Sequence, residues 1–358
     1  MKIPTETETV ERNLPPVPLS SEQIMDLFHN ASTQELICQA NRVCRQVHGK
    51  DVLLRGLIEF TNFCTNDCLY CGIRRGNQRV TRYRMTEAMI LSTVQKGYQR
   101  GIRSFVLQGG EDRNFTTDRI CRLVKTIKSQ GCHDAAITLS CGIRCREDYV
   151  KMRDAGADRY LLRFETADPV LHRLLRENSL EDRLKALEDI RAAGFQVGSG
   201  FMLGLPGESK ETRLKNILLC QRLELDMIGL GPFIPHPDTP LKHASQHPLE
   251  HTIRSVALVR LALPQAHIPA TTAAGSLVPD GREQTIAAGA NVLMPNLTPM
   301  EFKQNYLLYP GKVCLREKGI QDITRLHHRM KPLNRNLSFA RGDALGYPLT
   351  NMDKGDGK

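Results

Sequence analysis

From residue 53 onward, short apolar runs alternate with longer segments whose apolar residues recur at helical spacing. A short continuous apolar run indicates a buried strand, and apolar residues three and four positions apart indicate an amphipathic helix. The predicted strands are Leu54–Phe60, Ser104–Gln108, Ala136–Leu139, Arg159–Phe164, Gln196–Leu203, Asp226–Gly231, His267–Thr272 and Asn291–Met294. The predicted helices between them are Thr86–Arg100, Thr117–Ser129, Arg146–Ala155, Leu180–Ala193, Lys210–Leu223, Leu249–Leu261 and Gly281–Ala288.

This alternation predicts an α/β fold. Eight strand–helix units over about 250 residues are typical of a complete (β/α)8 TIM barrel, which we place at residues 51–314. Two tandem domains of four units each would be the competing layout, but no linker divides the pattern.

The flanking segments are predicted to be simpler. Residues 1–50 read as a loose leader followed by two helices, the first capped by Ser20 or Ser21 and the second running from Thr33 to His48. Residues 315–358 read as a polar tail, and we expect its last eight residues to be disordered.

Composition narrows the function classes. The longest apolar runs are shorter than the roughly 18 residues of a membrane span, and the acidic N-terminus lacks the apolar core of a secretory signal. Eleven cysteines in such a chain favour a reducing cytoplasm over a disulfide framework. The net charge of +10 is spread along the chain and there is no Trp, so it indicates anionic small ligands, an acidic partner or general solubility, and we do not expect nucleic-acid binding. The short apolar runs give no reason to expect a membrane.

The most informative motif lies just after the first predicted strand. Cys64, Cys68 and Cys71 have a C-x3-C-x2-C spacing, with Tyr70 before the last cysteine. Thiolates hold iron–sulfur clusters, usually four to a cubane, and three cysteines would leave one iron open to a small chelating ligand. A structural zinc site needs four protein ligands, and no nearby Cys or His supplies an obvious fourth. The spacing therefore favours a [4Fe–4S] cluster over zinc or scattered reduced thiols.

Polar residues follow several strands at the edge where a barrel carries its active site. Gln108–Asp112 contains two glycines that would let the backbone approach a ligand, although an ordinary glycine turn is equally compatible. Arg163 and Glu165 flank Phe164 and point the same way on a strand. Such a pair is costly in a barrel mouth unless it binds something, and a structural ion pair is the alternative. Arg183 reads, from the residues alone, as a solvated charge on a helix.

The later loops offer weaker signals. His236 lies in a proline-rich loop, where packing is a more usual role than ligation or base catalysis. Tyr306 and Tyr309 are three residues apart and would share a helix face or a turn, as polar groups of a cavity or as half-buried core aromatics.

Taken together, the motifs resemble one family of enzymes. The cysteine loop itself is similar to that of the radical S-adenosylmethionine (SAM) superfamily. The longer matching stretches are CGIRRGN (71–77), RYRMT (82–86), LQGGED (107–112), DRYLLRFET (158–166), GLPGE (204–208), GPFIPHPDTPL (231–241), IPATTA (268–273), VLMPNLTP (292–299) and YPGK (309–312). Over residues 22–315 these resemble the HydE family, the radical SAM maturases of the [FeFe]-hydrogenase cofactor. Biotin synthase and methylornithine synthase share the barrel and the cysteine loop.

The resemblance implies a role for individual residues. Cys64, Cys68 and Cys71 would ligate the cluster. The positions matching SAM contacts are Tyr70, Gln108, Gly109, Gly110, Glu111, Glu165, Arg183 and Met202. The positions matching the substrate cavity are Arg163, Thr271, Thr272, Met294, Tyr306 and Tyr309, among which Arg163, Tyr306 and Tyr309 are the expected catalytic residues.

The resemblance also implies the reaction. Such an enzyme cleaves SAM reductively to a 5′-deoxyadenosyl radical, which would act on an organometallic iron–cysteine substrate during assembly of the hydrogenase di-iron subcluster. Transient contacts with other maturation proteins would follow. A methylornithine-synthase-like amino-acid mutase is the alternative enzyme, and a SAM-binding scaffold without catalysis is the alternative from another class.

Two departures from the family pattern stand out. A late cysteine trio that carries a second cluster in some members is reduced here to Cys314, so no second cluster is expected. After the third strand, Ile143 replaces an expected acid, and Cys141 and Cys145 are also unusual.

Overall fold

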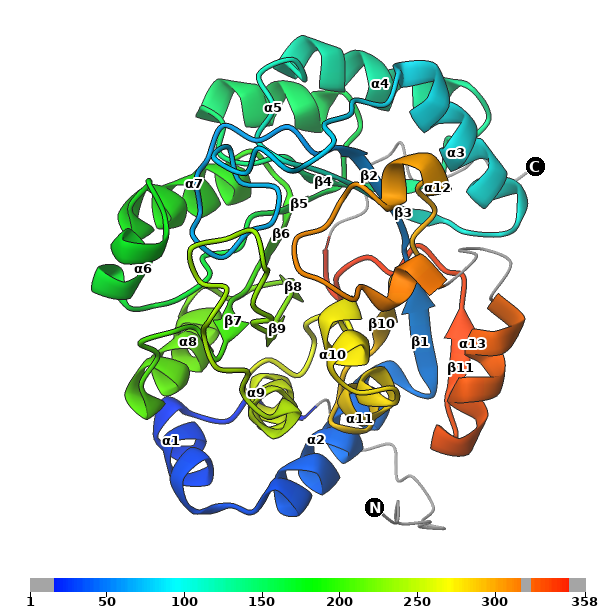
Figure 1. Ribbon diagram of the computed structural model, residues 1–358. Coiled ribbons are helices and arrows are strands. Elements are labelled where there is room, and N and C mark those ends of the chain that lie inside the picture. Colours follow the sequence, from blue (N-terminus) through cyan, green and yellow to red (C-terminus); the bar gives the residue numbers. More distant parts are fainter. Residues whose placement is uncertain (1–15, 317–322, 348–358) are drawn as a thin grey trace, which may run out of the picture.

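The centre of the molecule is a parallel β-sheet. A computed structural model describes residues 16–316 and 323–347 (Figure 1). Six strands run parallel in the order β2-β3-β4-β5-β6-β8. They are β2 (Gly56–Thr61), β3 (Ser104–Gly109), β4 (Ala136–Ser140), β5 (Arg159–Leu161), β6 (Gln196–Ser199) and β8 (Met227–Ile228). Helices surround these strands in Figure 1, as the alternating pattern predicts.

Beyond the six strands, the ring continues through a second sheet and single bridges. A three-stranded sheet has the order β10-β1-β11, with β1 at Asp51–Leu54, β10 at Val292–Leu293 and β11 at Asn336–Ser338. Isolated parallel bridges join Met227 to His267, Pro269 to Val292 and Leu57 to Asn296. The predicted strand His267–Thr272 is therefore only a pair of bridges, because Pro269 has no N–H for a ladder and a helix begins at Thr272.

Some predicted strands are interrupted by bends. The run Leu54–Phe60 divides between β1 and β2 at Arg55, and the run Gln196–Leu203 divides between β6 and β7 (Met202–Leu203). At the second break Gly200 has a φ of +146°, and a Cβ there would lie 2.0 Å from the carbonyl oxygen of Gly229. Strand β7 then pairs with β9 (Gly231–Pro232) in a small separate sheet. The break turns the chain toward the edge where the strands end.

The predicted helices are confirmed with small changes at their ends. In chain order they are α1 (Ser21–Asn30), α2 (Thr33–His48), α3 (Glu87–Gln99), α4 (Thr117–Ser129), α5 (Arg146–Asp154), α7 (Leu180–Ala192), α8 (Lys210–Arg222), α9 (Leu249–Ala262) and α11 (Gly281–Ala287). Ser20 and Ser32 form capping boxes at the starts of α1 and α2. The pattern missed α6 (Pro169–Leu175), α10 (Thr272–Leu277) and α12 (Met300–Lys303), which are too short to show helical periodicity.

The expected polar tail is wrong for the part that the structure describes. After the short 3₁₀ segment η1 (Val313–Arg316), the chain forms α13 (Ile323–Met330), η3 (Lys331–Leu333) and β11. Strand β11 pairs in parallel with β1, and α13 buries only Leu326 and Met330. So few apolar residues do not stand out from a polar sequence. The last eight residues, predicted to be disordered, lie outside the described ranges.

A single large core fills the space between the strands and the outer helices, drawing buried apolar residues from almost every element. Within the described ranges, none of the helices combines the length and apolarity needed to cross a membrane. Packing in this core holds the strands in place, and the predicted site residues follow the C-terminal ends of these strands.

Candidate active site

The segment that carries the three cysteines, Cys64–Asn77, is here called the cluster loop. It follows β2 and folds against the residues after β3, where the Thr65 N–H donates to the Glu111 carbonyl at 3.0 Å. Gly110 permits this approach, since a Cβ there would lie 2.2 Å from the Phe63 carbonyl oxygen and 2.9 Å from the Cys64 Cβ. The glycine in the predicted SAM-contact segment is thus required by the cluster loop itself.

The three thiols of the cluster loop are buried or half-buried. Burial raises the pKa of Cys64, Cys68 and Cys71, and the other two cysteines raise the pKa of Cys71 further. Among the described residues, no group of three or more His, Cys, Asp or Glu is arranged around one metal ion. In a cubane each thiolate binds a different iron, so the sulfurs do not converge on one point. A metal centre would also remove the thiol protons that burial otherwise retains.

A layer of buried and half-buried charged side chains lies beside the cluster loop. Arg163 Nη2 is 3.2 Å from Glu165 Oε2, and Arg183 Nη2 is 3.3 Å from Glu111 Oε1. Glu165 has a φ of +67°, a left-handed conformation that is uncommon for Glu and marks a strained, specifically shaped site. The structure therefore pairs Arg183 with Glu111, both predicted to contact SAM, and pairs Glu165, a third predicted SAM contact, with Arg163, which was predicted to bind the substrate.

Several polar atoms of this layer have no hydrogen-bond partner among the described residues. They are Nε and Nη2 of Arg163, Oε2 of Glu165, Nε of Arg183 and the hydroxyl of Thr271. Buried polar groups are nearly always satisfied in folded proteins, so a cluster of exceptions indicates a missing polar ligand. Sequence reasoning alone expected Arg183 to be solvated, yet only 5% of its side chain is exposed.

An apolar patch borders the charged layer. Leu171, Leu175, Leu205 and Phe233 form a small buried cluster. Tyr70 and Met202 pack against this cluster as partly buried side chains. Both were predicted to contact SAM, and an apolar wall next to a polar layer suits a ligand with an aromatic base and charged groups.

Only some of the residues predicted to line the substrate cavity contact other predicted site residues. Gln108 Nε2 lies 3.4 Å from the Tyr306 hydroxyl. Burial raises the pKa of both Tyr306 and Tyr309. The two tyrosines do not share a helix face, as one alternative expected, because α12 ends at Lys303 and both lie in the irregular segment that follows.

The remaining cavity residues lie at other strand ends. Thr271 precedes α10 at the N-cap position without a capping hydrogen bond from its side chain, and a Cβ on Gly231 would lie 2.7 Å from its hydroxyl. Thr272 begins α10 and Met294 follows β10. No hydrogen bond or ion pair within the described ranges joins Thr272 or Met294 to the other predicted cavity residues, so their role stays a prediction.

Two buried charges in this region escaped the sequence reasoning. Arg176 contacts the Tyr70 hydroxyl and lies 3.7 Å from Glu165. Lys312 donates to Glu59 at 2.7 Å and to the Tyr306 carbonyl at 2.8 Å. Arg176 lies in a polar stretch between two helices and carries no motif, whereas Lys312 ends the YPGK match and could have been weighed on that ground.

His236, left open between ligation and packing, packs against the cluster loop. Its side chain is buried, and a Cβ on Gly72 would lie 2.6 Å from its Cδ2. Its Nδ1 accepts from the Asp238 N–H at 3.1 Å. The residue therefore shapes the back of the cluster loop, next to Cys71.

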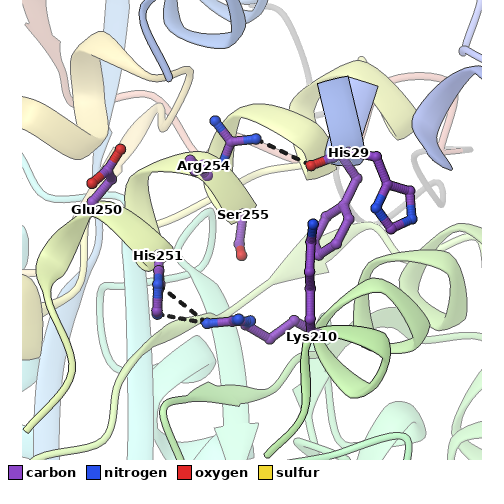
Figure 2. Close-up of a pocket in the computed structure, with 8 residues that line it drawn as sticks. His29, Lys210, Glu250, His251, Arg254 and Ser255 are labelled. Carbon is purple, nitrogen blue, oxygen red and sulfur yellow. Dashed lines mark hydrogen bonds between the residues drawn. The ribbon is translucent and has the colours of Figure 1, made fainter. Parts of the chain in front are cut away.

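A separate surface cleft of about 330 Å³ lies between α1, α8 and α9 (Figure 2). Its lining residues are Phe28, His29, Lys210, Arg213, Glu250, His251, Arg254 and Ser255. Within this cleft Arg213 Nη1 lies 2.6 Å from Nδ1 of His251. None of the predicted site residues lines this cleft, so the chemistry predicted from the sequence lies elsewhere.

Comparison with known proteins agrees with this geometry. Residues 58–220 match the model of the Radical SAM superfamily, and residues 231–312 match the Biotin and Thiamin Synthesis associated domain. The chain is 48% identical to the [FeFe] hydrogenase maturase subunit HydE of Thermotoga maritima, over 83% of this chain and 85% of that protein. It is 26% identical to 3-methylornithine synthase of Methanosarcina acetivorans, over 79% of this chain and 81% of that protein.

Solved structures share the fold at lower identity. Methylornithine synthase superposes with a TM-score of 0.77 at 24% identity, covering 90% of this chain and 95% of that one. The hydrogenase maturase HydG superposes with a TM-score of 0.77 at 17% identity, covering 90% and 73%. The cofactors of radical SAM enzymes are a [4Fe–4S] cluster and SAM, and the cysteine loop beside a partly unsatisfied charged layer fits both. On this sequence similarity, the chain belongs to the HydE family of radical SAM enzymes.

Proposed function

We propose that this protein cleaves SAM reductively and uses the resulting radical in assembly of the di-iron subcluster of the [FeFe]-hydrogenase cofactor. The observation that carries the proposal is a juxtaposition at one sheet edge. A loop with three cysteines lies beside Arg163, Glu165 and Arg183, which form ion pairs but keep buried polar atoms without a hydrogen bond among the described residues.

Each part of the site has a task in this proposal. Cys64, Cys68 and Cys71 would hold three irons, leaving the fourth to the amino and carboxylate groups of SAM. When bound, the reduced cluster supplies the electron that cleaves SAM into methionine and a 5′-deoxyadenosyl radical. Arg183 is aligned to bind the SAM carboxylate, because a guanidinium pairs well with a carboxylate and its Nε lacks a partner.

The neighbouring residues would orient the nucleoside part of SAM. Glu165 Oε2 faces Arg163 but accepts no hydrogen bond among the described residues, so it can accept from a hydroxyl or ammonium group of SAM. Gln108, Gly109, Gly110 and Glu111 offer backbone groups close to the cluster loop. Tyr70 and Met202 would cover the adenine with the apolar patch that they share.

The proposed substrate site lies farther inside the ring of strands. Arg163 would bind the carboxylate of an iron-bound cysteine, while Thr271, Thr272, Met294, Tyr306 and Tyr309 line the cavity. Water must be kept from the radical, and the burial of Tyr306 on the Gln108 side favours this. Other hydrogenase maturation proteins would supply the substrate and receive the product in transient contacts.

The larger organisation is also a proposal. The single bridges at His267, Pro269 and Asn296 support a complete (β/α)8 barrel over residues 51–314, with residues 1–50 before it and 315–358 after it. All eleven cysteines are free, which favours a reducing cytoplasm as the site of action.

A methylornithine-synthase-like mutase is the second candidate. It is favoured by the superposition on methylornithine synthase, which covers 95% of that chain. Its substrate would be an amino acid, and Arg163 could bind an amino-acid carboxylate equally well.

One experiment separates these candidates. Anaerobically reconstituted protein is incubated with SAM and dithionite, and 5′-deoxyadenosine is measured with no substrate, with L-lysine, or with a synthetic iron–cysteine carbonyl cyanide complex. We expect the iron complex alone to stimulate product formation. Stimulation by lysine would favour the mutase, and no product despite four bound irons would favour a scaffold without catalysis.

A cysteine variant tests the cluster assignment. Cys68→Ala should lose SAM cleavage and most bound iron while keeping the far-ultraviolet circular dichroism of the wild type. The matched control is Cys145→Ala, because Cys145 is exposed and makes no capping hydrogen bond at α5. Undiminished turnover in Cys68→Ala would overturn the assignment.

A further inference from the structure

Arg176 lies where α6 ends and α7 has not yet begun, and this short stretch receives the cluster loop. The Leu69 N–H donates to the Leu175 carbonyl at 3.0 Å, and the Asp67 N–H donates to Glu177 Oε2 at 3.2 Å. Three consecutive residues, Leu175 to Glu177, therefore contact the loop between its first and last cysteines.

The side chain of Arg176 points into the same contact. Only 7% of it is exposed, although its neighbours Arg173 and Glu177 lie in solvent. It meets the Tyr70 hydroxyl, which belongs to the residue just before Cys71, and its Nε donates to Asn178 Oδ1 at 3.2 Å. A buried guanidinium in this position ties the cluster loop to α6.

The charge of Arg176 is only partly balanced. Glu165 Oε1 is 3.7 Å away, but the other oxygen of Glu165 faces Arg163 at 3.2 Å. Arg183, the third arginine of the layer, is paired with Glu111. Three arginines thus share two carboxylates, leaving an excess of one positive charge beside the cluster loop.

The buried titratable group on α6 adds no charge. His172, one turn before Arg176, is fully buried with both ring nitrogens unpartnered. Burial, and after it Arg176 and Arg183, lower the pKa of His172 to about 4, so the ring is neutral near pH 7.

We propose that Arg176 is a positioning residue that holds the cluster loop through Tyr70 and supplies a buried positive charge favouring the reduced cluster. Reduction adds one electron to the cluster, and a nearby positive charge in a poorly solvated environment stabilises that added charge. Net charge and burial around the cysteines are known determinants of cluster potential. The inference rests on the proposed ligation by Cys64, Cys68 and Cys71.

The test is the reduction potential of the cluster, measured by redox titration with electron paramagnetic resonance in the absence of SAM. Arg176→Gln should shift the equilibrium toward the oxidised cluster by about tenfold, which is 59 mV for one electron. Arg176→Lys keeps the charge and should stay within about threefold of the wild type. Arg173→Gln, on the exposed side of α6, is the matched control and should leave the potential unchanged.

Several outcomes would overturn the proposal. These are an unchanged potential in Arg176→Gln, an equal shift in Arg176→Lys, or an equal shift in Arg173→Gln. If Arg176→Gln binds fewer than four irons while the other two variants bind four, the loop-holding role is supported, and Glu165→Gln then tests the charge. Removing that carboxylate should raise the potential, and an unchanged or lower value would overturn the electrostatic part. A wild type without four irons would instead refute the cluster assignment itself.

Discussion

Two arginines on or next to the same strand have opposite surroundings. Arg159 begins β5, and Arg163 follows the end of that strand two residues on. Arg159 is fully buried, and each of its three nitrogens has a partner: Gln196 for Nε, Ser104 for Nη1, and Asp343 with the Arg341 carbonyl for Nη2. Arg163 is 30% exposed in its side chain, and its Nε and Nη2 have no hydrogen-bond partner.

The difference separates a structural charge from a functional one. At the N-terminal end of β5, Arg159 is neutralised by the segment that follows β11 (red in Figure 1). There Asp343 Oδ1 lies 2.6 Å from Arg159 Nη2. Asp343 also accepts from Gln196 at 3.0 Å, and Arg341 pairs with Asp158 at 2.9 Å. Beyond the C-terminal end of β5, several polar atoms of Arg163, Glu165 and Arg183 have no hydrogen-bond partner among the described residues. A protein tolerates such incompleteness where a ligand finishes the network.

The largest expected effect comes from breaking the complete network. Arg159→Met should lower the free energy of unfolding by about 3–5 kcal/mol, because Asp343 would keep a charge without its main partner. Urea unfolding followed by circular dichroism measures this. Arg173→Met, an exposed arginine on α6, is the control. A loss below about 1 kcal/mol in Arg159→Met would contradict the structural reading.

Glu208 combines both situations, because one of its carboxylate oxygens has a hydrogen-bond partner and the other has none. Its effect on stability should therefore depend on pH. Its Oε2 accepts from the Gly204 N–H at 2.8 Å, while its Oε1 is buried without a partner. Burial raises the pKa of Glu208 from 4.5 to about 7, against the opposing backbone hydrogen bond. Between these values the folded protein binds the proton more tightly than the unfolded chain does.

Stability from this group is therefore fully present below pH 4.5 and is lost as the pH rises through 7. The gap of about 2.5 pH units corresponds to at most about 3 kcal/mol, since the side chain is only part-buried. Relative to Glu208→Gln, the wild type should lose stability by up to this amount between pH 4.5 and 7. Parallel pH profiles of the two proteins in urea unfolding would refute the assignment.

The incomplete end should gain stability when its ligand binds. SAM at a hundredfold its dissociation constant should stabilise the cluster-loaded wild type by about 2.7 kcal/mol. Arg183→Gln removes a charge-assisted contact worth about 1.5–3 kcal/mol. At the same SAM concentration its stabilisation should therefore fall to about 0.3–1.3 kcal/mol. Anaerobic thermal unfolding with and without SAM measures both values, and equal stabilisation would exclude Arg183 from the SAM site.

The sequence predicted the periodic parts of the molecule best. Helices α2 and α4 begin and end where their apolar spacing and capping residues place them, because local preferences and tertiary packing agree there. The predicted strand His267–Thr272 was wrong. Its apolar residues are buried, but only His267 and Pro269 form bridges to neighbouring strands, and after Thr271 the chain enters α10. Short elements such as α6 left no periodic trace.

The site was predicted through motifs, and its limits follow from that. The cysteine spacing identifies the cluster loop locally, whereas Arg183 looks solvated until the packing of α7 against Glu111 is known. Arg176 lacks any local signal, because its importance arises from a contact with Tyr70 that is 106 residues away in sequence. Charges that act across the fold are visible only when the fold brings them together.

The smallest stability effect should come from Arg163, and this directly tests the contrast with Arg159. Arg163→Met should change the free energy of unfolding by less than about 1 kcal/mol, because the side chain is partly solvated and Glu165 keeps Arg176 as a neighbour. Its effect should appear instead when the iron–cysteine complex stimulates 5′-deoxyadenosine formation. The concentration of complex that gives half-maximal stimulation should rise at least tenfold, because losing about 1.4 kcal/mol of carboxylate binding weakens affinity tenfold.

Measured side by side, the two methionine variants should show opposite defects, one in stability and the other in the response to substrate. Arg159→Met should unfold easily yet respond to substrate at the usual concentration while folded, and Arg163→Met should do the reverse. If Arg163→Met lost as much stability as Arg159→Met, its pair with Glu165 would be structural, and the unpartnered atoms beside the cluster loop would no longer indicate where the substrate binds.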